Sequence, residues 1–238
     1  MNKSSKLILV GSGPGAADLI TIRGAKAIAE ADVILYDALV DEKLLEYASD
    51  EAEKIYVGKR AGNHYASQDE INGLIASYAY QGKVILRLKG GDPGIFGRMA
   101  EEIDVAHKYN MALEVVPGVS SVIGIPTILQ MPLTQRGVSE SVWITTGTTA
   151  RCELSEDINI AAQSTATVII VMGMSRLQDI IAIFTIYRGV SHPIAIIYKG
   201  TTDEEIVIKG TLGNIMALYK EAKLSSPSLI IIGIQDNK

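Results

Sequence analysis

Short runs of β-branched and other apolar residues, each bounded by glycine or polar positions, recur from one end of the chain to the other. In the first half they lie at 7–10, 33–36, 55–57, 84–88 and 113–116. In the second half they lie at 142–145, 168–172, 194–198, 205–208 and 229–233. Such runs predict buried strands, and they are too short to span a bilayer, which needs about 20 apolar residues. We therefore expect no membrane partner.

Helical patterns separate the predicted strands. Apolar residues repeat at intervals of three and four between 71 and 79 and again between 99 and 106, which is the period of a helix. Ser67 precedes the first of these stripes, and Glu70 follows three positions later, the spacing of a capping box. The alternation of strands and helices predicts an α/β fold with a mainly parallel sheet, in which ligands gather at the carboxyl ends of the strands.

The second series of strands begins after Pro117 and Gly118, so we predict two α/β domains. The first would span residues 1–117 and carry the glycine loops, and the second would span 118–238, with the segment 117–132 joining them. A cleft between two such domains, with parallel or mixed sheets, is a natural small-molecule site. One continuous sheet is the structural alternative.

Composition restricts the classes of function. The chain has 238 residues, of which 47% are hydrophobic, and its net charge is −5. Phosphate binding needs an excess of Lys and Arg, so nucleic acid is not an expected partner. Cys152 is the only cysteine and the three histidines show no metal spacing, so we expect neither a disulfide nor a metal site. The single cysteine and the lack of a signal-peptide pattern indicate the cytoplasm.

The run from Val84 to Arg98 carries the strongest functional signal. A strand-like segment ends in a loop with four glycines within the eight positions 90–97, together with Asp92. Glycine lets the backbone pass close to a ligand, while Asp92 and Arg98 supply opposite charges at the edges of the loop. A purely structural turn rarely needs this combination, so the loop predicts a binding site. Arg87 and Lys89 are candidates either for a basic rim of the site or for caps of the strand end, and we leave them outside the predicted site.

The loop at 11–16 follows the first strand and has the spacing of a dinucleotide-binding fingerprint if Ala16 takes the third small position. Asp37 closes the second strand near the distance expected for a ribose-binding acid. Against this interpretation, Pro14 lacks an N–H, and the helical pattern starts only near Thr21, which leaves no helix N-terminus to face a pyrophosphate. An NAD-binding module is therefore the weaker alternative.

A third glycine-bounded loop, at 57–64, brings Lys59 and Arg60 to the end of another strand, without the spacing of a Walker A loop. Nothing in the chain has the pattern of a serine or cysteine triad. Asp37, Lys59 and Asp92 therefore stand at three strand ends, an arrangement that suggests a site that moves protons and holds a small charged ligand.

Taken together, these motifs resemble the tetrapyrrole methylase family, and within it the branch that methylates uroporphyrinogen III. The resemblance spans nearly the whole chain and rests on segments 10–15, 32–37, 57–62, 68–72, 87–96, 115–118 and 132–134. The chain departs from the family pattern at Met99, Ala100 and Gln135, which indicates different packing on the substrate side. A later corrin-ring methyltransferase, acting on a precorrin or cobalt-precorrin, is the nearer alternative.

The resemblance implies a homodimer that binds S-adenosylmethionine (SAM) between its two domains. It also implies transfer of methyl groups from two SAM molecules to C2 and C7 of uroporphyrinogen III, giving precorrin-2 and S-adenosylhomocysteine (SAH). SAM carries no phosphate, so Pro14 can shape a wall of its pocket. By family position, the expected SAM contacts are Pro14, Gly90, Gly91, Asp92, Ile95, Ser120, Ser121, Met172 and Gly200.

The resemblance also implies roles on the side of the tetrapyrrole substrate. Asp37 matches the position of a proton acceptor and Lys59 that of a proton donor. Arg98 and Glu101 match residues implicated near the substrate. Because uroporphyrinogen III is a polycarboxylate, Arg98 is expected to clamp one of its acetate or propionate groups.

Overall fold

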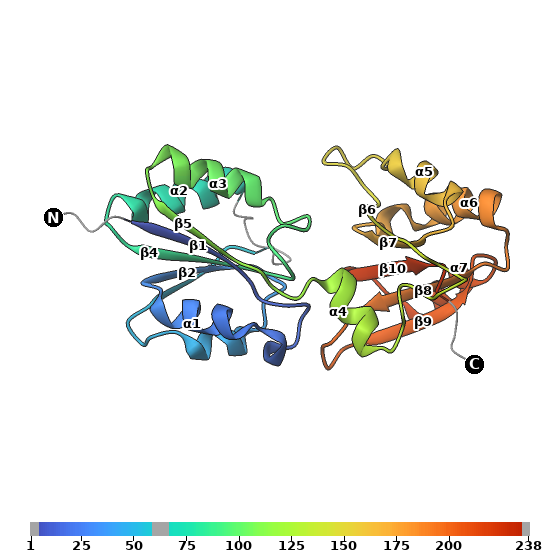
Figure 1. Ribbon diagram of the computed structural model, residues 1–238, viewed down its shortest axis with the longest axis horizontal. Coiled ribbons are helices and arrows are strands. Elements are labelled where there is room, and N and C mark those ends of the chain that lie inside the picture. Colours follow the sequence, from blue (N-terminus) through green and yellow to red (C-terminus); the bar gives the residue numbers. More distant parts are fainter. Residues whose placement is uncertain (1–4, 59–66, 235–238) are drawn as a thin grey trace. The chain divides into compact units, whose positions relative to one another are not determined.

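The chain folds into two compact units, Met1–Ser121 and Val122–Lys238, hereafter the N-terminal unit and the C-terminal unit. The computed structural model describes residues 5–58 and 67–234. Each unit has its own five-stranded sheet with helices packed on it (Figure 1). The alternative of one continuous sheet is therefore wrong, and the predicted α/β class is confirmed. The separate roles assigned to residues 1–117 and 118–238 remain a prediction.

The N-terminal sheet is parallel throughout. Its strands are β1 (Lys6–Gly11), β2 (Val33–Tyr36), β3 (Glu53–Tyr56), β4 (Val84–Lys89) and β5 (Ala112–Val116). Their order across the sheet is β3-β2-β4-β1-β5, and Leu9 of β1 pairs with Arg87 of β4 on one side and Val115 of β5 on the other. Because parallel strands all end on the same side, the loops that follow them meet at one edge, the carboxyl edge of this sheet.

Helices cover both faces of the parallel sheet, as strands that are apolar on both sides require. They are α1 (Ile22–Glu30), α2 (Gln68–Ala79) and α3 (Met99–Lys108), with 3₁₀ helices at Ala17–Leu19 and Glu42–Tyr47. Helix α1 packs on the face of Leu86 and Leu88, whereas α2 and α3 cover the face of Ile85 (Figure 1). The predicted capping box is confirmed, since Ser67 Oγ accepts from Glu70 N at 3.2 Å and Glu70 Oε2 accepts from Ser67 N at 2.6 Å.

The C-terminal sheet is mixed. Its strands are β6 (Val142–Thr146), β7 (Thr167–Val171), β8 (Pro193–Tyr198), β9 (Ile206–Thr211) and β10 (Ser228–Ile232). Their order is β6-β7-β10-β8-β9, with β6 and β7 parallel and the other neighbours antiparallel. All ten predicted strands are present, although β9 continues to Thr211, beyond its predicted end at 208.

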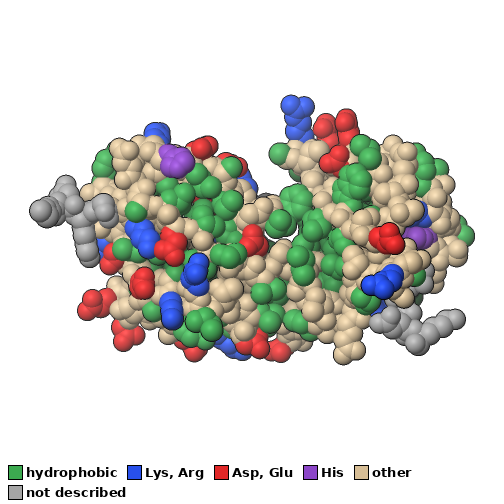
Figure 2. All heavy atoms as spheres, viewed as in Figure 1, with side chains coloured by type: hydrophobic (Ala, Val, Ile, Leu, Met, Phe, Trp, Pro, Cys, Tyr) green, Lys and Arg blue, Asp and Glu red, His purple; other side chains and the backbone are tan. Residues whose placement is uncertain are grey.

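The C-terminal unit has an apolar core with a few hydroxyl groups. Its helices are α4 (Ser121–Ile128), α5 (Asp157–Gln163), α6 (Leu177–Arg188) and α7 (Ile215–Ala222), with a 3₁₀ helix at Met174–Arg176. Phe184 of α6 is fully buried among aliphatic side chains. Ser139 Oγ and Thr167 Oγ1 lie 2.9 Å apart and satisfy each other's hydrogen bonding in the interior. On the face shown in Figure 2, basic and acidic side chains are interspersed rather than gathered into a basic patch.

Among the described residues, no helix combines the length and the apolar character that a membrane span would need. The same residues contain no group of three or more His, Cys, Asp or Glu side chains placed to hold a metal ion.

Candidate functional site

Three glycine-containing loops meet at the carboxyl edge of the N-terminal sheet, after the neighbouring strands β4, β1 and β5. Gly91 N donates a hydrogen bond to Gly13 O at 2.7 Å, and Gly13 N donates one to Gly91 O at 3.3 Å. A Cβ atom built on Gly11 or on Gly118 would lie 2.5 or 2.3 Å from Gly91 O. These positions therefore require glycine because the three backbones touch one another.

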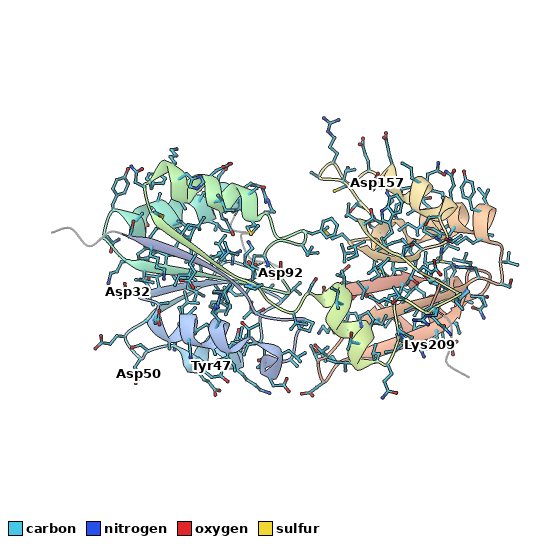
Figure 3. The ribbon with its side chains drawn as sticks, in the orientation of Figure 1. Asp32, Tyr47, Asp50, Asp92, Asp157 and Lys209 are labelled. Atoms are coloured by element: carbon cyan, nitrogen blue, oxygen red, sulfur yellow. The ribbon has the colours of Figure 1, made fainter. Side chains whose placement is uncertain are left out.

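Asp92 ties two of these loops together (Figure 3). Its Oδ2 accepts a hydrogen bond from Gly118 N at 3.0 Å, and its Oδ1 accepts one from Gly94 N at 2.8 Å. A carboxylate offers about four acceptor positions, so both oxygens keep capacity for a donor on a ligand. The loop-joining role escaped the sequence analysis because it depends on a partner 26 positions away. A contact between Asp92 and SAM remains a prediction.

Several predicted SAM contacts surround Gly91, whose φ of +66° lies in the region that favours glycine. A Cβ atom there would lie 3.6 Å from Ser121 N and 3.9 Å from Ser120 Cα. Pro14 directly follows the glycine that pairs with Gly91, and Ile95 extends from the same loop as Gly91 with 42% of its surface exposed. The structure thus brings these five residues to one place.

The chemistry of this group of residues fits SAM. The hydroxyl groups of Ser120 and Ser121 are half-buried and have no hydrogen-bond partner within the described part of the chain, so they are available to the polar groups of a ribose or an amino acid. Pro14 and Ile95 offer apolar surface beside them. Gly90 is needed for a different reason, because a Cβ atom on it would lie 2.9 Å from Leu39 Cβ in the loop after β2.

Asp37, the predicted proton acceptor, is the exposed end of a buried network of charged side chains. Arg87 Nη2 donates a hydrogen bond to Asp37 Oδ1, and Arg87 Nε donates to Glu102 Oε1 at 3.0 Å. Lys89 Nζ lies 2.8 Å from both oxygens of Glu102. Arg87 does contact the strand ends, because its Nη1 donates to Leu35 O and Leu88 O. Capping is only part of the role of the two cations, since both are only 3% exposed, face α3 and pair with Glu102.

One sequence signal could have revealed this network. Residues Ile85, Arg87 and Lys89 alternate along β4, which lies in the middle of a parallel sheet that is covered on both faces. Two cations on a covered face require buried acids opposite them. Burial lowers the pKa of Lys89, and neighbouring Arg87 lowers it further, while Glu102 acts in the opposite direction.

Arg98 and Glu101 form a pair on the surface rather than in the core. Arg98 Nε and Nη2 donate to the two carboxylate oxygens of Glu101, each at 2.7 Å. Arg98 immediately precedes α3 with a φ of 54°, so its side chain leaves the end of the glycine loop. The hydrogen bonds that Arg98 donates to Glu101 raise the pKa of Arg98. Both side chains stay accessible to a charged ligand, and their substrate contacts remain predictions.

Lys59, the predicted proton donor, and Arg60 lie outside the described residues, as does the rest of segment 59–66. Their predicted position next to Gly58, at the end of β3, follows from the sequence alone. The role of Lys59 therefore stays a prediction.

Met172 and Gly200, the predicted SAM contacts of the C-terminal unit, lie at the same edge of its sheet. They follow β7 and β8, which both run antiparallel to β10 between them. Met172 has a φ of 52° and is 53% exposed, and its carbonyl accepts a hydrogen bond from Thr148 Oγ1 at 3.1 Å. Gly200 is buried, because a Cβ atom on it would lie 2.7 Å from the side chain of Ile125 in α4.

The loop after β1 lacks the geometry of a dinucleotide site. It runs into the 3₁₀ helix Ala17–Leu19, and α1 begins only at Ile22, where Thr21 Oγ1 accepts from Gly24 N at 3.0 Å. The glycines at 11–15 therefore do not open a helix whose free N–H groups could hold a pyrophosphate. The NAD-binding alternative is not supported.

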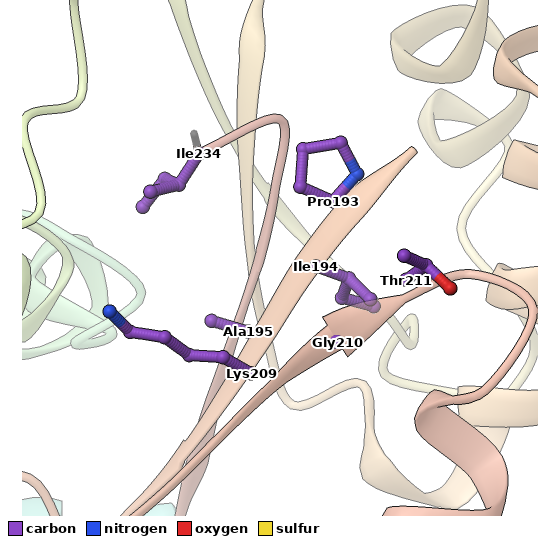
Figure 4. Close-up of a pocket in the computed structure, with 7 residues that line it drawn as sticks. All are labelled: Pro193, Ile194, Ala195, Lys209, Gly210, Thr211 and Ile234. Carbon is purple, nitrogen blue, oxygen red and sulfur yellow. The ribbon is translucent and has the colours of Figure 1, made fainter. Parts of the chain in front are cut away.

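One pocket of the C-terminal unit contains none of the predicted site residues. It is lined by Pro193, Ile194, Ala195, Lys209, Gly210, Thr211 and Ile234 (Figure 4). Pro193 begins β8 and pairs with the end of β9, so the pocket lies at the edge of the sheet opposite to Gly200. We assign it no role.

Comparisons with known proteins agree with the sequence motifs. The tetrapyrrole (corrin/porphyrin) methylase profile matches residues 6–216. The chain is 43% identical over 232 residues to a uroporphyrinogen-III C-methyltransferase of Methanocaldococcus jannaschii, covering 97% of this chain and 96% of that protein.

Two solved structures have the same fold. One is uroporphyrin-III C-methyltransferase of Thermus thermophilus in complex with SAH, with 32% identity, 96% and 97% of the two chains covered and a TM-score of 0.80. The other is a cobalt precorrin-4 methyltransferase, with 25% identity, 96% and 94% coverage and a TM-score of 0.85. The profile match and the identities together show that this chain belongs to the tetrapyrrole (corrin/porphyrin) methylases.

Proposed function

We propose that this chain is a SAM-dependent methyltransferase that converts uroporphyrinogen III to precorrin-2 by C-methylation at C2 and C7. The observation that carries the proposal is the 43% identity, over nearly the full length of both chains, to a protein of that name. The later corrin methyltransferase with the same fold is less similar in sequence, at 25% identity, although its TM-score is high. That enzyme defines the second candidate function.

In this proposal the carboxyl edge of the N-terminal sheet holds part of SAM, and SAH is released as product. Bound SAM supplies a methyl group activated by its positively charged sulfur. The backbone of Gly90 and Gly91 permits close approach, Asp92 and the serine hydroxyls orient polar groups, and Pro14, Ile95 and Met172 provide apolar contact. The remaining proposed contacts are Ser120, Ser121 and Gly200.

Residues of the chain would bind the tetrapyrrole and transfer its protons. A pyrrole carbon uses its π electron pair to form the new C–C bond, while the electron pair of the broken S–C bond stays on sulfur. Each transfer adds a methyl cation to the macrocycle and removes one proton net, which Asp37 is proposed to accept. Lys59 is proposed to donate a proton while the double bonds of the macrocycle shift and to regain one when they have rearranged, so that its own protonation state is unchanged at the end. Arg98, next to Glu101, is proposed to bind a carboxylate of the substrate. We propose a homodimer in the cytoplasm as the working form.

The direct test is incubation of the purified chain with SAM and uroporphyrinogen III under anaerobic conditions. Absorbance of precorrin-2 or of its oxidised form, with SAH released in step, is the expected result. Unchanged uroporphyrinogen III, together with methylation of a cobalt-precorrin, would favour the second candidate. Calorimetry with SAH and with NAD gives an independent check, since NAD binding without SAH binding would contradict both candidates.

A further inference from the structure

Among the described residues, the buried charge network reaches solvent at one end, Asp37. The side chains of Glu102, Arg87 and Lys89 are 0%, 3% and 4% exposed, whereas that of Asp37 is 29% exposed. Two cations and two acids balance one another within the network. The ion pairs therefore form a continuous chain from the interior, beneath α3, to the accessible carboxylate of Asp37 at the carboxyl edge of the sheet.

Arg87 is held in one orientation by its partners. Its Nε donates to Glu102, its Nη1 donates to Leu35 O and Leu88 O, each at 3.2 Å, and its Nη2 donates to Asp37. A guanidinium is planar, so these contacts leave it no freedom to rotate. The direction of the Nη2 donor, and with it the position of Asp37 Oδ1, is determined by groups on β2, β4 and α3.

The backbone of Asp37 is held as well. Asp37 N donates to Leu88 O at 3.2 Å, the same carbonyl oxygen that Arg87 Nη1 contacts. Among the described residues Arg87 is the hydrogen-bond partner of Asp37 Oδ1, and Oδ2 has none. One oxygen is thus bound to the protein, while the other remains available to accept a proton.

From this geometry we infer that Arg87 and Glu102 are positioning residues for the Asp37 carboxylate, with Lys89 holding Glu102 in place. The inference rests on the proposed function, in which Asp37 accepts the proton that leaves the macrocycle. Well-packed apolar side chains would serve the fold at least as well as buried ions. The network instead joins a helix of the core to Asp37, the acid proposed to accept the proton.

A double-mutant cycle tests the inference. Glutamine at 102 keeps one acceptor oxygen but presents an N–H₂ group to Lys89 or Arg87, so Glu102→Gln should release Arg87 from its fixed orientation. We expect Glu102→Gln to lower kcat by about 10²-fold, the size of effect that a small misplacement produces. In the Asp37→Asn background the same change should lower kcat by less than about twofold, because groups that act as a unit are not additive. An equal loss in both backgrounds would overturn the inference.

Controls separate positioning from folding. Arg87→Lys keeps the charge but not the planar guanidinium. It replaces Glu102→Gln in the double-mutant cycle if Glu102→Gln does not fold. Its matched control is Arg188→Lys in the C-terminal unit, where Arg188 donates to Ala161 O, Ala162 O and Ala166 O at 2.9–3.1 Å. We expect an unchanged KM for SAM in Glu102→Gln, Arg87→Lys and Arg188→Lys. Only Glu102→Gln and Arg87→Lys should lose kcat. An equal kcat loss in Arg188→Lys would contradict a positioning role.

Failure of the proposed function is distinguishable from failure of the inference. The proposed function fails if the unmodified protein makes no precorrin-2, and the inference falls with it. The inference alone fails if the unmodified protein is active and Asp37→Asn keeps full kcat, since there would be no catalytic carboxylate to position. A crystal structure of Arg87→Lys should show the Asp37 carboxylate displaced, and an unmoved carboxylate would likewise contradict the inference.

Discussion

The two units bury different kinds of polar side chain around their sheets. Within the described residues, the three buried charged side chains, Arg87, Lys89 and Glu102, all belong to the N-terminal unit. In the described part of the C-terminal unit, the buried polar side chains all carry hydroxyl groups, such as the pair of Ser139 and Thr167. The fold of a five-stranded sheet with helices therefore does not by itself call for buried charge.

The buried charge lies next to the loop that is proposed to bind SAM. It lies on β4 and α3, the two elements joined by the glycine loop that contains Asp92. The corresponding layer of the C-terminal unit is filled by aliphatic residues around Phe184. We conclude that the N-terminal unit carries charge where chemistry is proposed, whereas the core of the C-terminal unit serves stability.

The largest expected effect concerns the accessible end of the network. Asp37→Ala and Lys59→Ala should each lower kcat by about 10²–10⁴-fold, the usual contribution of a general acid or base. SAH affinity measured by calorimetry should stay the same, because both residues are assigned to proton transfer. Asp179→Ala is the control in the C-terminal unit, where this exposed acid faces Arg176 at 3.5 Å. Equal loss of SAH binding in both site variants would refute the division of roles.

The next effect compares the two cores directly. Glu102→Ala leaves two buried cations with one acid and should lower the free energy of unfolding by about 3–5 kcal/mol. Phe184→Ala should cost about 3–5 kcal/mol through the cavity it creates. Urea unfolding measures both losses, and kcat is then measured at a temperature where each variant is folded. Only Glu102→Ala should lose activity, and similar kcat losses in both variants would remove the functional contrast.

A smaller effect tests the glycine loop. Gly91→Val places a β-branched residue at a φ of +66° beside Ser120 and Ser121, a strain of about 1–3 kcal/mol. We expect SAH affinity to fall at least about tenfold, which corresponds to 1.4 kcal/mol. Gly189→Val is a matched control, since Gly189 has a φ of +79° and open space around it at the end of α6. Normal SAH binding by Gly91→Val would place the cofactor loop elsewhere.

The smallest expected effect is a pH dependence of the free energy of unfolding that comes from His192 in the C-terminal unit. Burial lowers the pKa of His192 below its ordinary value of 6.5, and Arg188, whose Nη1 is 3.3 Å from the ring, lowers it further. The unfolded chain then takes up the proton more readily than the folded one, so the free energy of unfolding is greatest above 6.5 and decreases as the pH falls. Urea titrations at about pH 7.5 and pH 5.5 should show this decrease, and His192→Gln should reduce it. An unchanged pH dependence in that variant would assign the decrease to other groups.

The sequence predicted the elements well because local patterns determine them. The capping box of Ser67 and Glu70 lies within four residues, and the central strand runs are mostly apolar on both faces, with Arg87 and Lys89 of β4 as exceptions. The motifs also identified the family and the loop from Gly90 to Arg98. Each of these features is written in consecutive residues, so no knowledge of distant partners is needed to recognise it.

Partners far apart in the chain had to come from the tertiary structure. Sequence reasoning placed Arg87 and Lys89 at the end of a strand, where they lie, but it gave them no buried partner. Folding brings α3 over β4 and sets Glu102 between them. Asp92 also joins two loops, and this role depends on Gly118, which is likewise distant along the chain. The sequence alone therefore determined which residues form strands, helices and glycine loops. Only the packing of those elements decided which charges are buried, because burial and pairing depend on neighbours that are distant along the chain.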